Sequence, residues 1–334
     1  MFAPTQYRQP HHSLRVRHSM KMLRTSLVTV LGFYISACST LTSTAPLSPT
    51  PEPVVELPSV ALVLGGGGAK GFAHVGVIKA LEANGIKPTL IVGTSVGSLV
   101  GSLYASGYTP LQLEQLALTT TDSQLTDFTL SNQGFIEGIK LKNFVNNKVS
   151  AKAIEDFPIA FAAVAAEKHT LKKAVFTTGD AGLAVQASCS VPNIFIAPRI
   201  PEKVGKKYID GGVVSLVPID SARDLGADIV IAVDVTAALD NGATDNKALT
   251  ISSLSDFWGL LETNVVSSTI RSSSIRRERD RADVLITLAV SHISSIDTSQ
   301  RRALIAAGSQ ATTAQMAAIK QLIKEKANRK YAIL

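Results

Sequence analysis

Residues 60–71 read VALVLGGGGAKG and run straight into a helical pattern that begins at Phe72. Five apolar residues in a row predict a buried strand of a parallel sheet. The glycines that follow leave their backbone N–H groups uncovered and allow φ values closed to other residues. We therefore predict a strand, a tight turn and a helix, with several N–H donors gathered at the positive end of the helix dipole, where an anion would bind.

The same turn satisfies the pattern G-x-G-x-x-G at Gly66, Gly68 and Gly71, which by itself is a weak signal for a dinucleotide. Such a site also needs an acidic residue about 20 positions further on, and residues 92–95 read VGTS instead. A phosphate-binding loop of the Walker type is excluded, because Gly71 rather than Ser or Thr follows Lys70. Two interpretations remain, a site for a transient oxyanion and a purely structural turn, and we favour the oxyanion.

A second strand, turn and helix is predicted at residues 90–106, which read LIVGTSVGSLVGSLYAS. Residues 93–97 (GTSVG) match the motif G-x-S-x-G in the strand-to-helix context of a nucleophile elbow. Gly93 and Gly97 permit the sharp turn and close packing beneath it, and Ser95 lies at the tip. The alternative is glycine-rich packing around an inert serine.

A serine hydroxyl becomes a strong nucleophile only when a nearby base takes its proton. After residue 58 the chain has three histidines, His74, His169 and His292. His74 is predicted to be a structural residue on the first helix, and His169 lies in a polar turn. His292 leaves open the chain order Ser, Asp, His of the α/β-hydrolases. Asp210 is the better partner, because the two glycines that follow it let another stretch of backbone approach.

Strand-like and helix-like segments alternate along the rest of the chain. The predicted strands are residues 60–64, 90–92, 158–165, 173–177, 228–235 and 283–289. The predicted helices are residues 72–84, 97–106, 110–119, 181–188, 218–225 and 304–324. Such alternation predicts an α/β fold of three layers (α/β/α), in which helices cover both faces of a largely parallel central sheet.

The net charge of +7 comes from 33 Lys and Arg against 26 Asp and Glu. Residues 1–38 contain five of the basic residues and no acid, so the remainder of the chain carries only +2. A nearly neutral body argues against a nucleic-acid partner.

The N-terminal region is predicted to contain an export signal followed by a linker. Residues 1–37 comprise an extension and a signal peptide, because a short basic run precedes an apolar stretch, residues 25–37, that ends in small side chains. As a helix this stretch would span only about 20 Å, less than the core of a bilayer. Residues 35–38 (ISAC) resemble the lipobox of bacterial lipoproteins, in which the cysteine, here Cys38, is acylated. Residues 38–58, rich in Pro, Ser and Thr, form an extended spacer, and residues 59–330 form the folded domain.

The glycine turn, the serine motif and the sequence Asp-Gly-Gly at residues 210–212 occur in the order typical of patatin-like phospholipases. Over about residues 59–235 the chain resembles that family, in particular its bacterial RssA-like branch. The resemblance implies that Ser95 is the nucleophile and Asp210 the general base of a dyad without histidine. It also implies an oxyanion hole at Gly66, Gly67 and Gly68, and supporting roles for Lys70, Gly71, Gly93, Gly97, Gly211 and Gly212. Lys70 stands where many members carry Arg.

By this resemblance the chain is a serine hydrolase of phospholipase A type that acts on lipid or fatty-acyl esters. We expect no metal or other cofactor, because the sequence contains no H-E-x-x-H, paired C-x-x-C or EF-hand pattern. Two alternatives stay open, a Ser-Asp-His esterase that uses His292 and a lipid-binding lipoprotein without activity. Besides the substrate, the expected partner is a membrane, reached through an acylated Cys38. Because Ser39 rather than Asp follows Cys38, the likeness to Gram-negative lipoproteins implies the outer membrane, facing the periplasm.

Overall fold

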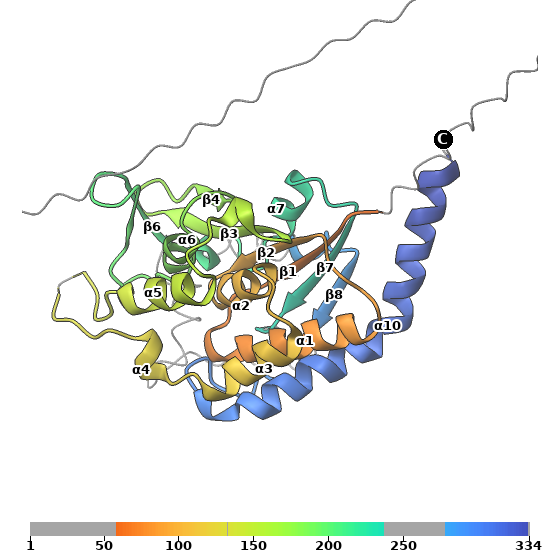
Figure 1. The fold of residues 1–334 in the computed structure, drawn as a ribbon, viewed down its shortest axis with the longest axis horizontal. Helices are drawn as coiled ribbons and strands as arrows, with labels where there is room; N and C mark the ends of the chain where they lie inside the picture. The colour runs from red at the N-terminus through yellow and green to blue at the C-terminus, as the bar shows by residue number, and fades with distance from the viewer. Residues whose placement is uncertain (1–57, 132, 237–277, 333–334) are drawn as a thin grey trace, which may run out of the picture. The chain divides into compact units, whose positions relative to one another are not determined.

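The computed structural model describes residues 58–131, 133–236 and 278–332 (Figure 1). The predicted signal peptide, Cys38 and all of the predicted tether except Pro58 lie outside these ranges. Within them, no helix combines the length and the apolar character that crossing a bilayer would require.

The centre of the sheet is parallel, and its strands run in the order β3-β2-β1-β7-β8. Their bounds are β1 (Val60–Leu64), β2 (Leu90–Thr94), β3 (Ala160–Glu167), β7 (Ile229–Asp234) and β8 (Val284–Thr287). Every residue of β1, β2 and β7 is buried. Runs of Val, Ile, Leu and Ala on both faces are what a parallel strand covered by helices requires.

The edge of the sheet beside β3 is antiparallel. Strand β4 (Lys173–Phe176) and strand β6 (Lys206–Asp210) both pair with β3, and the short β5 (Arg199–Ile200) pairs with β6. The pairing of β6 brings Asp210 opposite Ala165, near the carboxyl end of β3.

Helices cover both faces of the sheet, and Figure 1 shows α7 on one side and α1, α3 and α10 on the other. The larger core packs under α1 (Phe72–Ala83), α2 (Val96–Ala105), α3 (Pro110–Thr119), α5 (Ile139–Lys148), α6 (Ala181–Ser188) and the start of α10 (Arg301–Ala332). Leu62 and Ile91 point into this core, whereas their neighbours Val63 and Val92 point toward α7 (Ile219–Asp224). The predicted three-layer α/β/α fold with a largely parallel sheet is confirmed.

The predicted strands and helices of the parallel part are all present, with boundaries shifted by a few residues at most sites. Helix α5 was not predicted, because its sequence IKLKNFVNNK buries only Leu141 and Val145 and contains three asparagines, which have modest helix propensity. Strands β5 and β6 were not predicted either, since a two-residue strand and a strand with exposed lysine carry little apolar periodicity.

Candidate active site

Ser95 lies at a sharp turn between β2 and α2, with φ 54° and ψ −128°. A non-glycine residue with such backbone angles is strained, and strain of this kind is concentrated at functional sites. The turn is close-packed underneath, because a Cβ atom on Gly97 would lie 2.0 Å from Leu64 O and one on Gly93 would lie 2.5 Å from Gly97 C. Only 4% of Ser95 is exposed. The predicted strand, turn and helix are therefore present around this serine.

The strained turn is fixed by a buried hydroxyl of α6. The Ser95 N–H donates to Ser188 Oγ over 2.8 Å, and the Ser188 hydroxyl donates to Val164 O of β3 over 2.6 Å. A second bond, from Thr94 Oγ1 to Ser215 O over 2.9 Å, ties the end of β2 to the chain that follows Asp210. Ser188 was not among the candidate site residues from sequence, although it lies in a stretch, residues 187–195, whose resemblance to a family segment between the serine motif and the aspartate implies a structural role.

Asp210 is the last residue of β6 and is fully buried. Its N–H donates to Ser190 O over 2.9 Å, and its Oδ1 accepts a 2.7 Å hydrogen bond from the Gly212 N–H. A Cβ atom on Gly211 would lie 2.2 Å from Val164 O. The absence of a side chain at Gly211 is thus what lets β6 approach β3, as the sequence predicted for the glycines after this aspartate.

The sheet register brings Ser95 and Asp210 together. Thr94 pairs with Val164 and Asp210 pairs with Ala165, so both candidate residues flank the same end of β3. Burial raises the pKa of Asp210 to about 7, and the Ser95 hydroxyl and the Gly212 N–H oppose part of this rise. The Ser95 hydroxyl interacts with the carboxylate. Within residues 58–131, 133–236 and 278–332, no group completes a hydrogen bond to Asp210 Oδ2. Catalytic hydrogen bonds are often long before substrate binds.

The thiol of Cys189 lies against this pair, and its Sγ is 3.9 Å from Ser98 Oγ. Burial raises the pKa of Cys189, and the charge of Asp210 raises it further. The thiol therefore stays protonated and acts as an apolar neighbour of the two candidate residues.

The glycine turn packs directly against Ser95, since a Cβ atom on Gly66 would lie 3.3 Å from Ser95 Cβ. The Gly66 N–H is already used, because it donates to Leu216 O over 3.0 Å. Among the residues that the structure describes, no acceptor lies at the N–H of Gly67 or of Gly68. Of the three predicted oxyanion donors, only the N–H groups of Gly67 and Gly68 are therefore available to bind an oxyanion. A Cβ atom on Gly68, which has φ +57°, would lie 2.3 Å from Ser295 O.

Lys70 and Gly71 end the 3₁₀ turn Gly68–Gly71. Lys70 is buried, and burial lowers its pKa while the charge of Asp234 opposes the shift. A Cβ atom on Gly71 would lie 2.3 Å from Val96 Cγ2, so this glycine lets the turn pack on the start of α2.

None of the three histidines reaches the dyad. His74 Nε2 is 2.8 Å from Gly65 O, and complete burial lowers the pKa of His74 to about 4, so the ring is neutral and structural, as predicted. His169 and His292 are exposed, and within the described part of the chain neither has a hydrogen bond to Ser95 or Asp210. The same ranges contain no group of three His, Cys, Asp or Glu side chains arranged to bind a metal.

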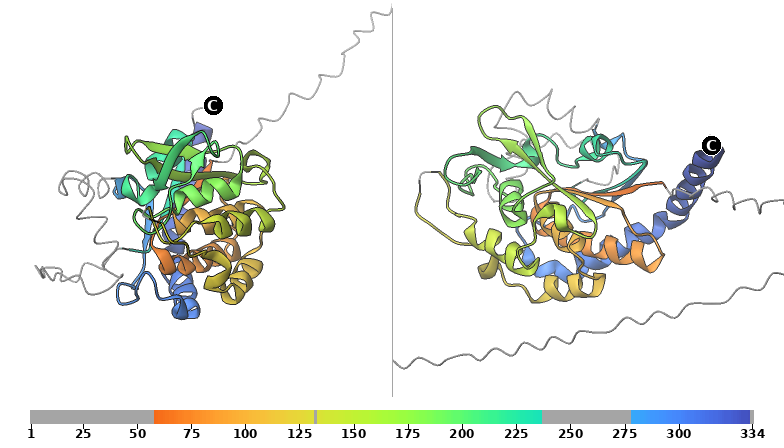
Figure 2. Two further views of the ribbon diagram at one scale, coloured as in Figure 1. Left: turned by 90° about the vertical axis from the view of Figure 1, so that its left-hand side faces the viewer. Right: turned by 45° about the horizontal axis from the view of Figure 1, so that its top comes forward.

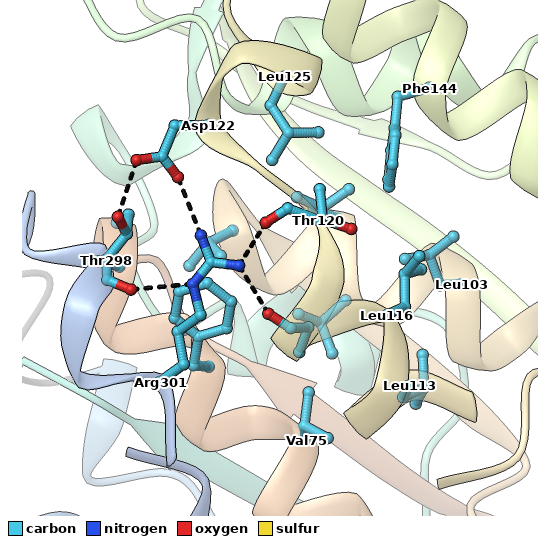
Figure 3. A pocket seen from close by; sticks show the side chains of 18 residues that line it. Val75, Leu103, Leu113, Leu116, Thr120, Asp122, Leu125, Phe144, Thr298 and Arg301 are labelled. Carbon is cyan, nitrogen blue, oxygen red and sulfur yellow. Dashed lines mark hydrogen bonds and ion pairs between the residues drawn. The ribbon is translucent and has the colours of Figure 1, made fainter. Parts of the chain in front are cut away.

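An apolar cavity of about 200 Å³ lies among α1, α2, α3 and the start of α10 (Figure 3). Its lining includes Gly68 and Ala69 of the glycine turn and Val96, the residue after Ser95. The rest of the wall is mainly aliphatic and aromatic, and includes Val75, Leu103, Leu113, Leu116, Leu125 and Phe144. The cavity therefore begins beside both candidate motifs and is suited to an alkyl chain.

A polar group closes one side of this cavity (Figure 3). Arg301 donates from Nε to Thr298 O over 2.9 Å, from Nη1 to Ala117 O over 2.8 Å and from Nη2 to Asp122 Oδ1 over 3.1 Å. Its guanidinium also stacks over the ring of Phe72, 4.9 Å from the centroid. These contacts join the first turn of α10 to α3 and to α4 (Asp122–Leu125).

Comparison with known proteins agrees with this geometry, because residues 62–223 match the model of the patatin-like phospholipase family. These residues contain the glycine turn, Ser95 and Asp210. The chain belongs to the patatin-like phospholipase family. Patatin-like phospholipase domain-containing protein 6 of Homo sapiens is 33% identical over 208 residues, which are 60% of this chain and 15% of the human protein. An NTE family protein of Mycobacterium tuberculosis is 36% identical over 194 residues, 56% of this chain and 52% of that one.

This chain thus spans about half the length of its mycobacterial relative and a small part of the human one. Among solved structures, VipD from Legionella pneumophila has the same fold, with a TM-score of 0.53 and 14% sequence identity over 81% of this chain and 67% of that one. The patatin-like domain therefore provides the framework in which the serine and the aspartate meet.

Proposed function

We propose that the chain is a lipid acyl hydrolase that cleaves fatty-acyl esters with Ser95 as nucleophile and Asp210 as general base. The observation that carries the proposal is a strained serine beside a fully buried carboxylate whose pKa is about 7. A general base with a pKa near 7 is largely ionised at neutral pH and is still basic enough to accept a proton. Family membership supports the same reaction class.

In the proposed mechanism, Asp210 Oδ2 accepts the proton of the Ser95 hydroxyl as Ser95 Oγ attacks the ester carbonyl. The negative charge that develops on the carbonyl oxygen is stabilised by the N–H groups of Gly67 and Gly68. Collapse of this tetrahedral intermediate breaks the ester bond, and the leaving alcohol takes the proton from Asp210. Asp210 then deprotonates a water molecule, which attacks the carbonyl of the acyl-serine. The bond to Ser95 Oγ breaks, the proton returns from Asp210 to Ser95 Oγ, and the fatty acid is released.

The apolar cavity supports a fatty-acyl substrate. It contacts Gly68 and Val96 and continues between the helices, so an acyl chain in the cavity would end near the serine. Burying each methylene there would contribute about 0.8 kcal/mol to binding. Leu116→Trp would shorten the cavity, and we expect it to shift the preferred p-nitrophenyl ester toward shorter chains.

Hydrolysis of p-nitrophenyl esters by the full chain tests the proposal. Ser95→Ala should remove turnover and abolish labelling by a fluorophosphonate, whereas Ser123→Ala, which removes an exposed hydroxyl, should do neither. Full activity in Ser95→Ala would refute the nucleophile. A chain with no hydrolysis and no labelling would favour the lipid-binding alternative.

His292→Gln separates the dyad from the Ser-Asp-His alternative. The exposed position of His292 favours unchanged turnover in this variant. A fall to the level of Ser95→Ala would instead assign the base to His292.

We further propose that residues 1–37 direct export, that Cys38 is acylated and that residues 38–58 tether the domain of residues 59–330 to a bacterial outer membrane, facing the periplasm. The basic run, the apolar stretch and the ISAC sequence support this address. Expression in a Gram-negative host with radiolabelled palmitate tests it. The wild-type chain should incorporate label and fractionate with the outer membrane, and Cys38→Ser should do neither.

A further inference from the structure

A strongly basic surface adjoins the antiparallel edge of the sheet. Residues 167–173 and 199–207, which we call the cationic face, contain seven basic and two acidic side chains. The basic residues are Lys168, Lys172, Lys173, Arg199, Lys203, Lys206 and Lys207. Residues 39–334 together carry a net charge of only +2. The cationic face alone carries +5, so the other residues of 39–334 have a negative net charge.

The two segments of the cationic face are held together by hydrogen bonds. The Lys168 N–H donates to Lys207 O over 2.9 Å, and Lys206 forms a 3.0 Å ion pair with Glu167. The other acid, Glu202, pairs with Lys142 of α5 at 2.6 Å. Both acids are therefore already matched with lysines, and Lys168, Lys172 and Lys203 are exposed.

Exposed apolar side chains occur in the β5–β6 turn and in a loop that contacts Lys207 of β6. We call Phe128, Leu130, Phe135 and Val204 the apolar rim; they are 81%, 101%, 62% and 83% exposed. Val204 lies in the β5–β6 turn, and Lys207 Nζ donates to Gln133 Oε1 of the 128–135 loop over 2.8 Å. In the right-hand view of Figure 2, this loop and the β5–β6 hairpin lie at the same side of the molecule.

The cationic face lies on the active-site side of the sheet. Tyr208 pairs with Glu167, so Lys206 and Lys207 continue beyond the carboxyl end of β3, the same end that Ser95 and Asp210 flank. Lys206 is four residues from Asp210 along β6, which corresponds to about 13 Å.

We infer that the cationic face and the apolar rim form a docking surface for an anionic phospholipid bilayer. Lysines attract the negative headgroups, and exposed Phe, Leu and Val side chains enter the boundary between headgroups and acyl chains. Phe128 and Phe135 have rings that can stack on a nucleic-acid base, but Leu130 and Val204, the most exposed of the four, have none. All four side chains can enter a bilayer, which favours the lipid over a polynucleotide. Docking by this face would bring the active-site end of the sheet toward the bilayer. That advantage for capturing a lipid substrate rests on the proposed hydrolase function, whereas the binding itself does not.

Vesicle binding by the full chain tests the inference, with Ser95→Ala as the background so that no lipid is consumed. The probe is a phosphatidylcholine vesicle with or without one third phosphatidylglycerol. Each lysine near an anionic surface contributes about a factor of five, so loss of the three lysines in K168E/K172E/K203E should weaken binding to the phosphatidylglycerol vesicles on the order of 100-fold. The three introduced glutamates should weaken it further. The matched control K87E/K152E/K324E makes the same charge change at exposed lysines outside this face and should weaken binding by less than threefold.

Equal losses in the two triple variants would overturn the inference, because attraction would then follow net charge alone. Residues 1–57 are common to both variants, so their contribution to vesicle binding cancels. L130S/V204S should weaken the binding that survives in high salt by about tenfold, and an unchanged value would overturn the role of the apolar rim. Unchanged circular dichroism in every variant would confirm that the fold is kept.

A change of oligomeric state separates the lipid from a second copy of the chain. If light scattering without vesicles finds a dimer that K168E/K172E/K203E dissociates, the face is a contact between copies and the inference is wrong. In the active chain, the same variant should keep its rate on a soluble short-chain ester and lose rate on phosphatidylglycerol vesicles. If the chain with Ser95 intact binds the vesicles but hydrolyses neither substrate, the proposed function is wrong and the docking inference still holds.

Discussion

The parallel centre of the sheet and its antiparallel edge hold the two proposed catalytic residues by different means. At the centre, Ser95 is positioned by its own neighbours in sequence, since Gly93 and Gly97 allow β2 and α2 to meet at a turn with φ 54°. At the edge, Asp210 is positioned by residues distant in sequence, because its N–H bonds to Ser190 and its strand pairs with β3.

The two regions also differ in exposure. Strands β1, β2 and β7 are buried throughout, whereas β6 begins at an exposed lysine and ends at a fully buried aspartate. Strand β6 therefore has an exposed charged residue at its start and a buried acidic residue at its end, beside Ser95. The centre fixes the position of the proposed nucleophile, and burial at the edge raises the pKa of the proposed base.

The largest effect should follow from neutralising the edge. Asp210→Asn removes the base, and we expect kcat for a p-nitrophenyl ester to fall by about 10⁴-fold. The matched control Asp224→Asn makes the same charge change at an exposed site and should leave kcat unchanged. Retention of activity in Asp210→Asn would show that another group takes the serine proton.

The same variant should gain stability at alkaline pH. The folded pKa of about 7 is above the ordinary value of 3.8, so the unfolded chain releases this proton first. Asp210 therefore destabilises the fold increasingly as pH rises from 3.8 to about 7 and by a constant amount, about 4 kcal/mol, at higher pH. Thermal melts at pH 8 and pH 5 should show a larger gain for Asp210→Asn at pH 8, and a loss at pH 8 would contradict the raised pKa.

At the centre, Gly68→Ala should lower kcat by about 10²- to 10³-fold, which is typical for loss of an oxyanion donor. The added Cβ would lie 2.3 Å from Ser295 O at a residue with φ +57°, so the turn would have to shift away from the carbonyl. The comparison variant is Gly85→Ala, which also has positive φ but has no atom within 4 Å. A lowered kcat in Gly85→Ala of similar size would mean that lost stability, not lost donors, explains both.

The contrast also explains what could be predicted from sequence. The turn at Ser95 follows from residues 90–106 alone, because strand, glycines and helix are contiguous. Asp210 needed the likeness to a family as well, since its local sequence gives only a carboxylate before two glycines. Ser188 was missed because its contacts, to Ser95 and Val164, join segments far apart in the chain.

The cationic face was hidden for the same reason. Along the sequence its lysines are interspersed with other residues, and the net charge of the body is small. Only the pairing of β6 with β3 gathers the two segments on one surface. The apolar cavity likewise depends on how α3 and α10 pack, which the helical patterns of residues 110–119 and 304–324 do not specify.

A smaller effect is expected from pH on the unmodified chain. If Asp210 is the base, kcat/KM should be constant above about pH 8 and fall tenfold per unit well below pH 7. Other buried groups near the site titrate elsewhere, because burial lowers the pKa of His74 to about 4 and raises that of Cys189. A profile flat down to pH 5 would exclude Asp210 as the group that must be ionised.

The smallest effect should come from the hydroxyl that joins centre and edge. Ser188→Ala leaves the Ser95 N–H without its acceptor and releases one restraint on the strained turn, so we expect kcat to fall about tenfold with little change in KM. The unfolding free energy should fall by about 1 to 3 kcal/mol, as for other buried hydrogen bonds.

Ser190→Ala is the matched control, because Ser190 is equally buried two residues away but its hydroxyl donates to Gln186 O over 2.6 Å. Its carbonyl, which accepts the Asp210 N–H, is retained in the variant. Both variants should therefore lose similar stability in urea melts, and only Ser188→Ala should lose kcat. Equal kcat in the two variants would mean that the backbone of residues 93–97 alone holds Ser95, with no help from α6, and would make the centre of the sheet still more independent of its edge.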